Sequence, residues 1–308
     1  MGFVLFLLRR FLRLLLTILI ISTIIFFVIR VIPGDPALVV AGIDASDEEI
    51  QAIRVKLGTD APVAVQYVNW MKDIVKLDFG KSLTSNQPVL KLIRQRFSLT
   101  FTLAILGILL GVVIAIPLGV LSAVHRWSVW DYFGMVFSQL GMAVPSFWLG
   151  IILLLIFSVK FPIFPLFGSD SLKNLVLPAI ALGFARAAVI LRLTRASMVD
   201  ELSKEYIITA RAKGLTEKMI HYKHALKNAL IPVITVTGIQ FGYMLGGAII
   251  IEQVFSLPGL GRLFLYAIYQ RDFPLIQGGV VFIAIIFSLT NFIVDIFYSI
   301  LNPKIRLS

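Results

Sequence analysis

The chain has 308 residues, of which 58% are hydrophobic and 15% are charged, and its formal net charge is +11. A soluble protein of this length does not need so much apolar surface, so the composition predicts a protein that crosses a membrane several times. The basic residues lie in loops between apolar segments. The positive-inside rule for cytoplasmic loops explains this charge, so nucleic acid is not needed as a partner. The absence of cysteine excludes disulfides and thiolate metal sites.

The first apolar run covers residues 11–29 and begins at a basic cluster of Arg9, Arg10 and Arg13. It is long enough to cross a bilayer. Pro33-Gly34-Asp35-Pro36 follows it where a signal peptide would have a small-residue cleavage site, so we expect a retained helix. Residues 1–31 are therefore predicted to form an N-terminal tail and the first transmembrane helix.

Residues 32–97 have a different composition, with eight acidic and eight basic side chains. We expect a short helix at 47–57 with Asp47 as its cap, and a second helix at 62–77 opened by Pro62. The turn sequence Asp78-Phe79-Gly80-Lys81-Ser82 follows. This segment is predicted to be a small extracytoplasmic subregion, too short for a separate enzyme domain.

Five more apolar runs of spanning length follow, at 99–124, 132–159, 175–191, 230–251 and 275–301. Prolines in or at the start of these runs should kink or begin helices: Pro117, Pro145 and Pro178. Glycines four apart should allow close helix packing: Gly107 with Gly111, and Gly238 with Gly242 and Gly246. The chain is thus predicted to be an all-α integral membrane protein with six transmembrane helices.

Six spans place both termini on one side of the membrane, and the basic loops indicate which side. The loops with a basic excess contain Arg9, Arg10 and Arg13; Arg126; residues 192–227; and Lys304 with Arg306. The segments 32–97, 160–174 and 252–274 are close to neutral. The positive-inside rule therefore predicts cytoplasmic termini.

Signatures of enzyme active sites are absent from the sequence. It contains no phosphate-binding P-loop, no dinucleotide-binding glycine pattern, no nucleophile elbow and no zinc-protease motif. His221 and His224 are three residues apart and could share a metal, but solvated or capping histidines in a basic helix are the favoured interpretation because no third ligand is close. No catalytic residue and no metal site is predicted.

Two charged residues fall inside the apolar runs, Arg186 and Asp295. A charge within the membrane is costly, so each is a candidate for the translocation pathway. The alternatives are an ion pair between them, or an Arg186 side chain that extends to the membrane surface. Asn291 lies one turn from Asp295 on the same helix face, and the predicted pathway set is completed by Gln240 and Tyr243.

Residues 205–232 form a basic, polar segment between two apolar runs. A helical start, Gly214 and a second helical run that ends at Pro232 predict a helix–turn–helix, which we call the elbow. The positive-inside rule places it in the cytoplasm.

The elbow resembles the cytoplasmic coupling loop of the permease subunits of ABC-type importers, in the dipeptide/oligopeptide/nickel permease group. The matching residues are Tyr206–Leu215 and, further on, His224-Ala225-Leu226-Lys227-Asn228-Ala229-Leu230-Ile231-Pro232. Other similar segments occur in order along the chain: Pro33-Gly34-Asp35-Pro36, Asp78-Phe79-Gly80-Lys81-Ser82, residues 193–198, residues 252–261, residues 291–298 and residues 302–306. The chain departs from the general importer motif at Ile208-Thr209-Ala210, where that motif has Glu-Ala-Ala.

The resemblance implies a type I ABC importer permease fold in the inner (cytoplasmic) membrane of a prokaryote, with a five-helix permease core at 98–301, a coupling loop at 199–231 and a cytoplasmic tail at 302–308. It implies a heterodimer with a second homologous permease, two cytoplasmic ATP-binding subunits and an extracytoplasmic solute-binding protein. ATP and Mg would be bound by the partner subunits, so this chain is expected to be neither an enzyme nor the holder of a cofactor. A short helix at 209–215 would dock on an ATPase and move the flanking spans through Arg195 and Pro232.

The resemblance also assigns site residues. The predicted contacts with the ATPases are Glu205, Tyr206, Thr209, Ala210, Arg211, Ala212, Gly214 and Leu215. The predicted contacts with the binding protein, in the loop after the fifth span, are Glu252, Gln253, Phe255, Pro258 and Gly259.

The expected function is import of di- and oligopeptides, with nickel complexes, glutathione or oligosaccharides as alternative cargo. A proton-driven secondary transporter with Asp295 as its proton site is a second hypothesis, although the internal repeats of such carriers are not evident. A membrane enzyme or a structural assembly factor is a third, and the missing catalytic groups disfavour the enzyme.

Overall fold

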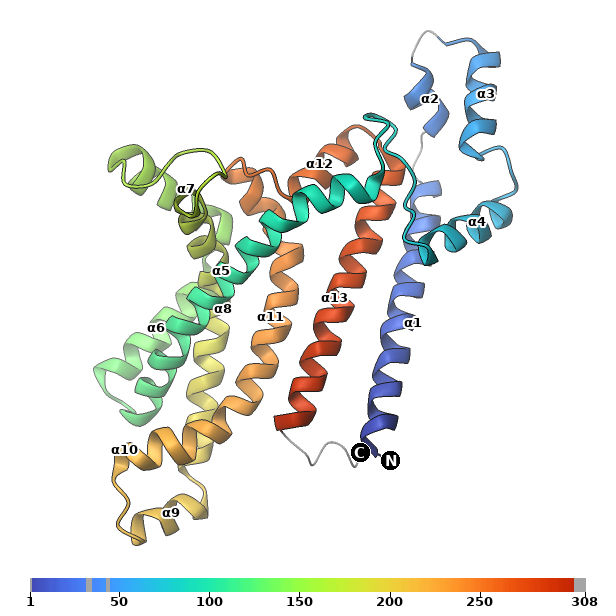
Figure 1. The fold of residues 1–308 in the computed structure, drawn as a ribbon. Helices are drawn as coiled ribbons and strands as arrows, with labels where there is room; N and C mark the ends of the chain where they lie inside the picture. The colour runs from blue at the N-terminus through green and yellow to red at the C-terminus, as the bar shows by residue number, and fades with distance from the viewer. Residues whose placement is uncertain (1, 32–34, 43–44, 302–308) are drawn as a thin grey trace. The chain divides into compact units, whose positions relative to one another are not determined.

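The computed structural model describes residues 2–31, 35–42 and 45–301, and the regular elements in these ranges are helices (Figure 1). The chain divides into two compact units. The first unit contains Met1–Phe11, Thr100–Leu257 and Leu289–Ser308, and the second contains Leu12–Leu99 and Pro258–Ser288. Two of the sequence motifs, Pro33-Gly34 and residues 302–306 with Lys304 and Arg306, lie outside the described residues.

Among the described residues, five helices are long and apolar enough to cross a membrane, and a bent pair brings the number to six if it is one span. The five long segments are Val4–Val31, Val89–Val124, Leu172–Leu202, Glu217–Gly246 and Phe273–Ser299. Each overlaps a predicted apolar run, which confirms those runs as helices. Four of them lie within α1 (Gly2–Val31), α5 (Val89–Val124), α8 (Leu172–Leu202) and α13 (Phe273–Leu301), and the segment Glu217–Gly246 ends in α11 (Leu226–Val254).

The predicted run at 132–159 is not one straight helix. It comprises α6 (Val129–Ala143), α7 (Ser146–Leu154) and the π-helix η1 (Leu155–Lys160), with a bend of 100° between α6 and α7. Val144 and Pro145 are both extended at the bend, because a residue before proline is driven out of the helical region. Pro145 thus begins a helix, as predicted, whereas Pro117 and Pro178 lie inside α5 and α8.

Helix α8 contacts α6, α7 and α11 in the first unit. Its approach to α5 is close because both helices present glycine. A Cβ added at Gly183 would lie 2.4 Å from the carbonyl oxygen of Gly107, and a Cβ at Gly111 would lie 3.4 Å from that of Gly183. The predicted packing role of the Gly107 and Gly111 pair is therefore confirmed.

The second unit contains three short helices after α1: α2 (Pro36–Ala41), α3 (Asp47–Leu57) and α4 (Val63–Val75). The N-cap of α3 is Ser46, which forms a reciprocal capping box with Glu49, so the predicted cap at Asp47 was one residue too late. Pro62 precedes α4 as predicted, but α4 ends at Val75 because Leu77 adopts a positive φ of 59°.

Aromatic and apolar side chains hold the second unit together. Phe26 of α1 contacts Tyr67 and Trp70 of α4, at ring-centroid distances of 5.1 and 5.3 Å. Helix α12 (Leu260–Tyr269) packs through Phe264 into a buried cluster with Val89 and others. In the turn before Val89, the amide of Gly80 donates to Asp78 Oδ1 while Gly80 adopts a φ of 73°, which favours glycine.

Candidate functional site

The elbow begins directly after α8 and contains three short helical elements. They are α9 (Glu205–Ala212), α10 (Glu217–Met219) and the π-helix η2 (Ile220–Ala225). Gly214, between α9 and α10, has a φ of 77°, so the predicted glycine turn is confirmed. Helix α9 covers residues 205–212 and not the predicted 209–215, because the chain leaves the helix before that glycine.

The second helical run of the elbow does not end at Pro232. That proline lies inside α11, which continues to Val254. Proline removes one backbone hydrogen bond, a loss that a membrane helix tolerates when neighbouring helices support it. The elbow is therefore joined to a span without a break, from η2 into α11.

Helix α9 has one buried face and one exposed face. Ile207 and Ala210 pack into an apolar cluster with Met198 of α8 and Ile220 of η2. The neighbouring Ile208 has 61% of its surface exposed, although it is apolar. Five of the predicted ATPase contacts are exposed as well: Glu205, Thr209, Arg211, Ala212 and Gly214. Figure 1 shows α9 running across the end of α8, so its exposed face points away from the bundle.

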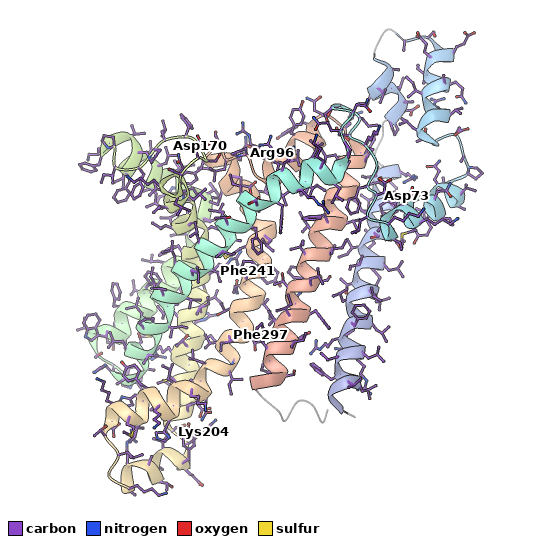
Figure 2. All side chains as sticks on the ribbon, in the orientation of Figure 1. Asp73, Arg96, Asp170, Lys204, Phe241 and Phe297 are labelled. Atoms are coloured by element: carbon purple, nitrogen blue, oxygen red, sulfur yellow. The ribbon has the colours of Figure 1, made fainter. Side chains whose placement is uncertain are left out.

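Tyr206 fastens the elbow to the helices on both sides of it. Its hydroxyl donates to Glu201 Oε2 at 2.7 Å and accepts from Asn228 Nδ2 at 3.2 Å. Burial, followed by the hydrogen bond to Glu201, raises the pKa of the Tyr206 phenol. Lys204, labelled in Figure 2, pairs with the other oxygen of Glu201. Of the predicted ATPase contacts, Tyr206 thus has a positioning role, while Ala210 and the partly buried Leu215 belong to the packed side.

An ion pair closes the turn around Gly214. Arg211 donates from Nε to Glu217 Oε1 at 2.7 Å and from Nη2 to Oε2 at 3.2 Å. This hydrogen bond raises the pKa of Arg211. His221 Nε2 also lies 3.1 Å from Glu217 Oε2. Within the described residues no cluster of three or more metal-ligating side chains is found, and His221 faces this carboxylate.

The predicted pathway residues fall into two groups in the first unit. In one group, Arg186 of α8 donates from Nη1 to Gln240 Oε1 of α11 at 3.0 Å. Tyr243, one turn further along α11, is 53% exposed. The second group lies on α13, where Asp295 forms an ion pair of 2.9 Å with Arg10 of α1.

The possible ion pair between Arg186 and Asp295 is therefore not formed, because each has a different polar partner. Their positions inside apolar runs did not show which helices are neighbours. The half-buried Asn291 lies on the same helix as Asp295.

Three of the five predicted binding-protein contacts are buried, and Gly259 is one of them. Glu252 belongs to α11, is 0% exposed and accepts a hydrogen bond from Thr100 Oγ1 at 2.5 Å. Phe255 is 4% exposed, whereas Gln253 is exposed. The side chains of Glu252 and Phe255 therefore cannot form a docking surface in this structure. The remaining predicted contacts, Pro258 and Gly259, precede α12 in the second unit.

A buried ion pair escaped the sequence analysis. Arg195 of α8 donates from Nε and Nη2 to the two oxygens of Asp131 at 2.5 and 2.8 Å, and Asp131 is 0% exposed. The backbone amide of Trp127 donates to the same carboxylate at 3.0 Å. The partners are 64 residues apart, so no local pattern could have joined them. Ile208 was also missed, although the spacing of α9 puts it on the face of Glu205 and Thr209.

Comparisons with protein families place almost the whole sequence. Residues 115–307 match the family described as binding-protein-dependent transport system inner membrane component. Residues 3–104 match the family of N-terminal segments of such membrane components.

Individual proteins give the same picture. The glutathione transport system permease protein GsiC of Salmonella typhimurium strain LT2 is 41% identical over 303 residues, covering 98% of both chains, and GsiC of Escherichia coli strain K12 has the same identity and coverage. A chain from inward-facing structures of the MetNI methionine ABC transporter has a TM-score of 0.57 at 18% identity, covering 69% of this chain and 97% of its own. A chain from an amino acid ABC transporter crystallised with histidines has a TM-score of 0.53 at 18% identity, covering 70% and 94%.

Proposed function

Because this chain belongs to the family of binding-protein-dependent transport system inner membrane components, we propose that its elbow docks a cytoplasmic ATPase and that its spans line part of a pathway for peptides. The chain is the permease subunit of an ABC importer and a multi-pass protein of the inner membrane. Its helical fold is that of ABC importer permeases. The expected family, the helical membrane fold, the role as an ABC importer permease and the inner-membrane location are thereby confirmed.

The observation that carries the docking proposal is the contrast between Ile207 and Ile208. Ile207 is 0% exposed, while Ile208 is 61% exposed next to it on α9. A large apolar side chain on the outer face of a polar segment is suited to a pocket on a partner protein. The ion pair between Arg211 and Glu217 and the hydrogen bonds of Tyr206 hold that face in place.

The test compares the two isoleucines in the complex reconstituted with its partner subunits. We expect Ile208→Glu to lower transport and the ATP hydrolysis stimulated by loaded binding protein by about tenfold, as loss of an apolar interface anchor does. Its thermal unfolding should match the unchanged protein because Ile208 is exposed.

The matched control is Ile207→Ala, which removes apolar packing from the cluster under α9. It should lower the unfolding free energy by about 2–5 kcal/mol, so it separates loss of packing from loss of docking. Normal transport and normal stimulated hydrolysis in Ile208→Glu would refute the docking proposal.

The other subunits of the transporter are proposed from the family to which this chain belongs. A second homologous permease would complete the pathway, two ATP-binding subunits would bind ATP and Mg, and a solute-binding protein would deliver the cargo. Helix α8 and helix α11 leave the elbow on either side, so a displacement of docked α9 would reach both spans. Purification of the complex, followed by counting of its subunits, tests this composition.

The sidedness follows from the basic loops and stays a proposal. The elbow and both termini would be cytoplasmic, and residues 32–97 extracytoplasmic. The chain has no cysteine, so single cysteines report cleanly on access. A membrane-impermeant maleimide should label Ser85→Cys from outside the cell and should label Ser203→Cys only after lysis, and the reverse pattern would overturn the topology.

The proposed cargo is short peptides. The two GsiC relatives are permeases of glutathione transport systems, and glutathione is itself a small peptide. Nickel complexes and oligosaccharides are the alternatives. Binding of each solute class to the cognate solute-binding protein is the measurement that decides, and preference for a non-peptide solute would exclude this cargo.

A further inference from the structure

The second unit contains a pocket with a volume of about 440 Å³, which we call the Arg96 pocket. It lies between the loop at 82–85, the start of α5 and the start of α12. Its volume falls in the range of roughly 300–1,000 Å³ that is usual for pockets of small ligands. Figure 2 shows Arg96 on the part of α5 that lies beside α12.

The charged residues of the lining are both arginines, Arg96 and Arg262. Arg96 donates from Nη1 to the carbonyl oxygen of Pro258 at 3.3 Å. A guanidinium has five N–H donors. Within the described residues one donor of Arg96 bonds to Pro258, so most of its donors are available to a ligand. Tyr266, which is 54% exposed, adds a hydroxyl to the same lining.

The wall formed by the 82–85 loop is fixed by a buried carboxylate. Asp272 is 0% exposed and accepts from Ser82 Oγ at 2.5 Å, from the Leu83 amide at 3.1 Å and from the Thr84 hydroxyl at 3.0 Å. These donors satisfy the charge of Asp272 behind the wall. Arg96 and Arg262, both exposed, are the charged side chains in the lining of the pocket itself.

We propose that the Arg96 pocket binds the C-terminal carboxylate of a short peptide. A planar guanidinium matches a carboxylate with two parallel hydrogen bonds, and Leu92 and Leu275 offer apolar lining for the residue that bears the carboxylate. A concave pocket of this volume suits a free solute better than the flat surface of a docked protein. The assignment deepens the proposed function, since it rests on peptides as cargo, and makes the pocket a subsite for them.

The test measures equilibrium binding of trialanine, and of trialanine with its C-terminus amidated, to the purified complex without ATP and without binding protein. Trialanine should bind at least about tenfold more tightly than its amide, because the amide loses the charge-assisted hydrogen bonds. Arg96→Gln and Arg262→Gln should each weaken trialanine binding by about tenfold and leave the amide unchanged. The binding measurement needs no ATP hydrolysis. It would therefore give the same result even if the elbow did not dock an ATPase.

The matched control is Arg94→Gln, which removes the same charge from α5 two residues away, outside the pocket lining. It should leave trialanine binding within about twofold, since residues two apart face different directions on a helix. Equal binding of trialanine and its amide, or an equal loss in Arg94→Gln, would overturn the proposal. So would a result in which the arginine variants weaken only the docking of the solute-binding protein, which would make the pocket a protein contact.

Discussion

Two ion pairs in the first unit have the same chemistry and opposite surroundings. Arg195 and Arg211 each hold a carboxylate with two hydrogen bonds, but Asp131 is fully buried while Glu217 is exposed on the elbow. A buried pair is costly to break because it leaves an uncompensated charge, whereas an exposed pair is screened by water and salt. The difference separates a buried pair that fixes α8 to α6 from an exposed pair at the turn of the elbow.

The largest expected effect comes from breaking the buried pair. Asp131→Ala leaves Arg195 without its carboxylate and removes the acceptor of the Trp127 amide. We expect the unfolding free energy to fall by about 3 kcal/mol, the lower end of the range for such pairs because Arg195 is partly exposed. Chemical denaturation of the purified permease in detergent measures it.

A double-mutant cycle provides the control for the buried pair. Asp131→Ala combined with Arg195→Ala should cost less than the sum of the two single changes, because the double variant has no unpaired charge. Strict additivity would show that the two side chains do not interact. The contrast between the buried and the exposed ion pair would then no longer hold.

A medium effect is expected at the turn between α9 and α10. Gly214 has a φ of 77° and no heavy atom within 4 Å of an added Cβ, so only the backbone resists substitution. Gly214→Ala should cost roughly 1 kcal/mol, while Gly214→Pro, which requires a negative φ, should distort the turn. We expect Gly214→Pro to uncouple ATP hydrolysis from transport, with both rates measured in proteoliposomes. Unchanged transport with unchanged stimulation of hydrolysis would count against coupling through this turn.

The smallest expected effect comes from Glu217→Gln. It removes the charge that Arg211 faces across the exposed turn, where solvent screening leaves little to lose. Thermal unfolding should be indistinguishable from that of the unchanged chain at high salt and only slightly earlier at low salt. A loss comparable with that of Asp131→Ala would show that exposure does not explain the difference between the two pairs.

The sequence analysis succeeded where the information is local. Apolar runs predicted the spanning helices, Pro145 predicted a helix start, and Gly214 predicted a turn. The N-cap of α3 was placed one residue too late because both Ser46 and Asp47 can cap a helix, and the Ser46 hydroxyl accepts from the amide of Glu49. The 100° bend after α6 was not predicted, because a proline indicates a break but not its angle.

The sequence analysis failed where side chains from distant helices meet. Arg195 was singled out as a link between the elbow and the spans, but no sequence pattern shows that its helix faces Asp131. The partner of Arg186 was left open for the same reason, and in the structure Arg186 donates to Gln240 of α11 while Asp295 pairs with Arg10. Burial of Glu252 was likewise hidden, because a carboxylate near the end of a span looks like a loop residue.

The glycine contact between α5 and α8 limits how the first unit can move. At Gly183 the two backbones approach so closely that a single added carbon would lie 2.4 Å from the carbonyl oxygen of Gly107. Backbones in such contact have no side chains between them that can change rotamer, so α5 and α8 should travel as one rigid body. The hinge must then lie elsewhere, and the two extended residues at Val144 and Pro145 offer one. A displacement of the elbow would then rotate the α5–α8 pair relative to α7.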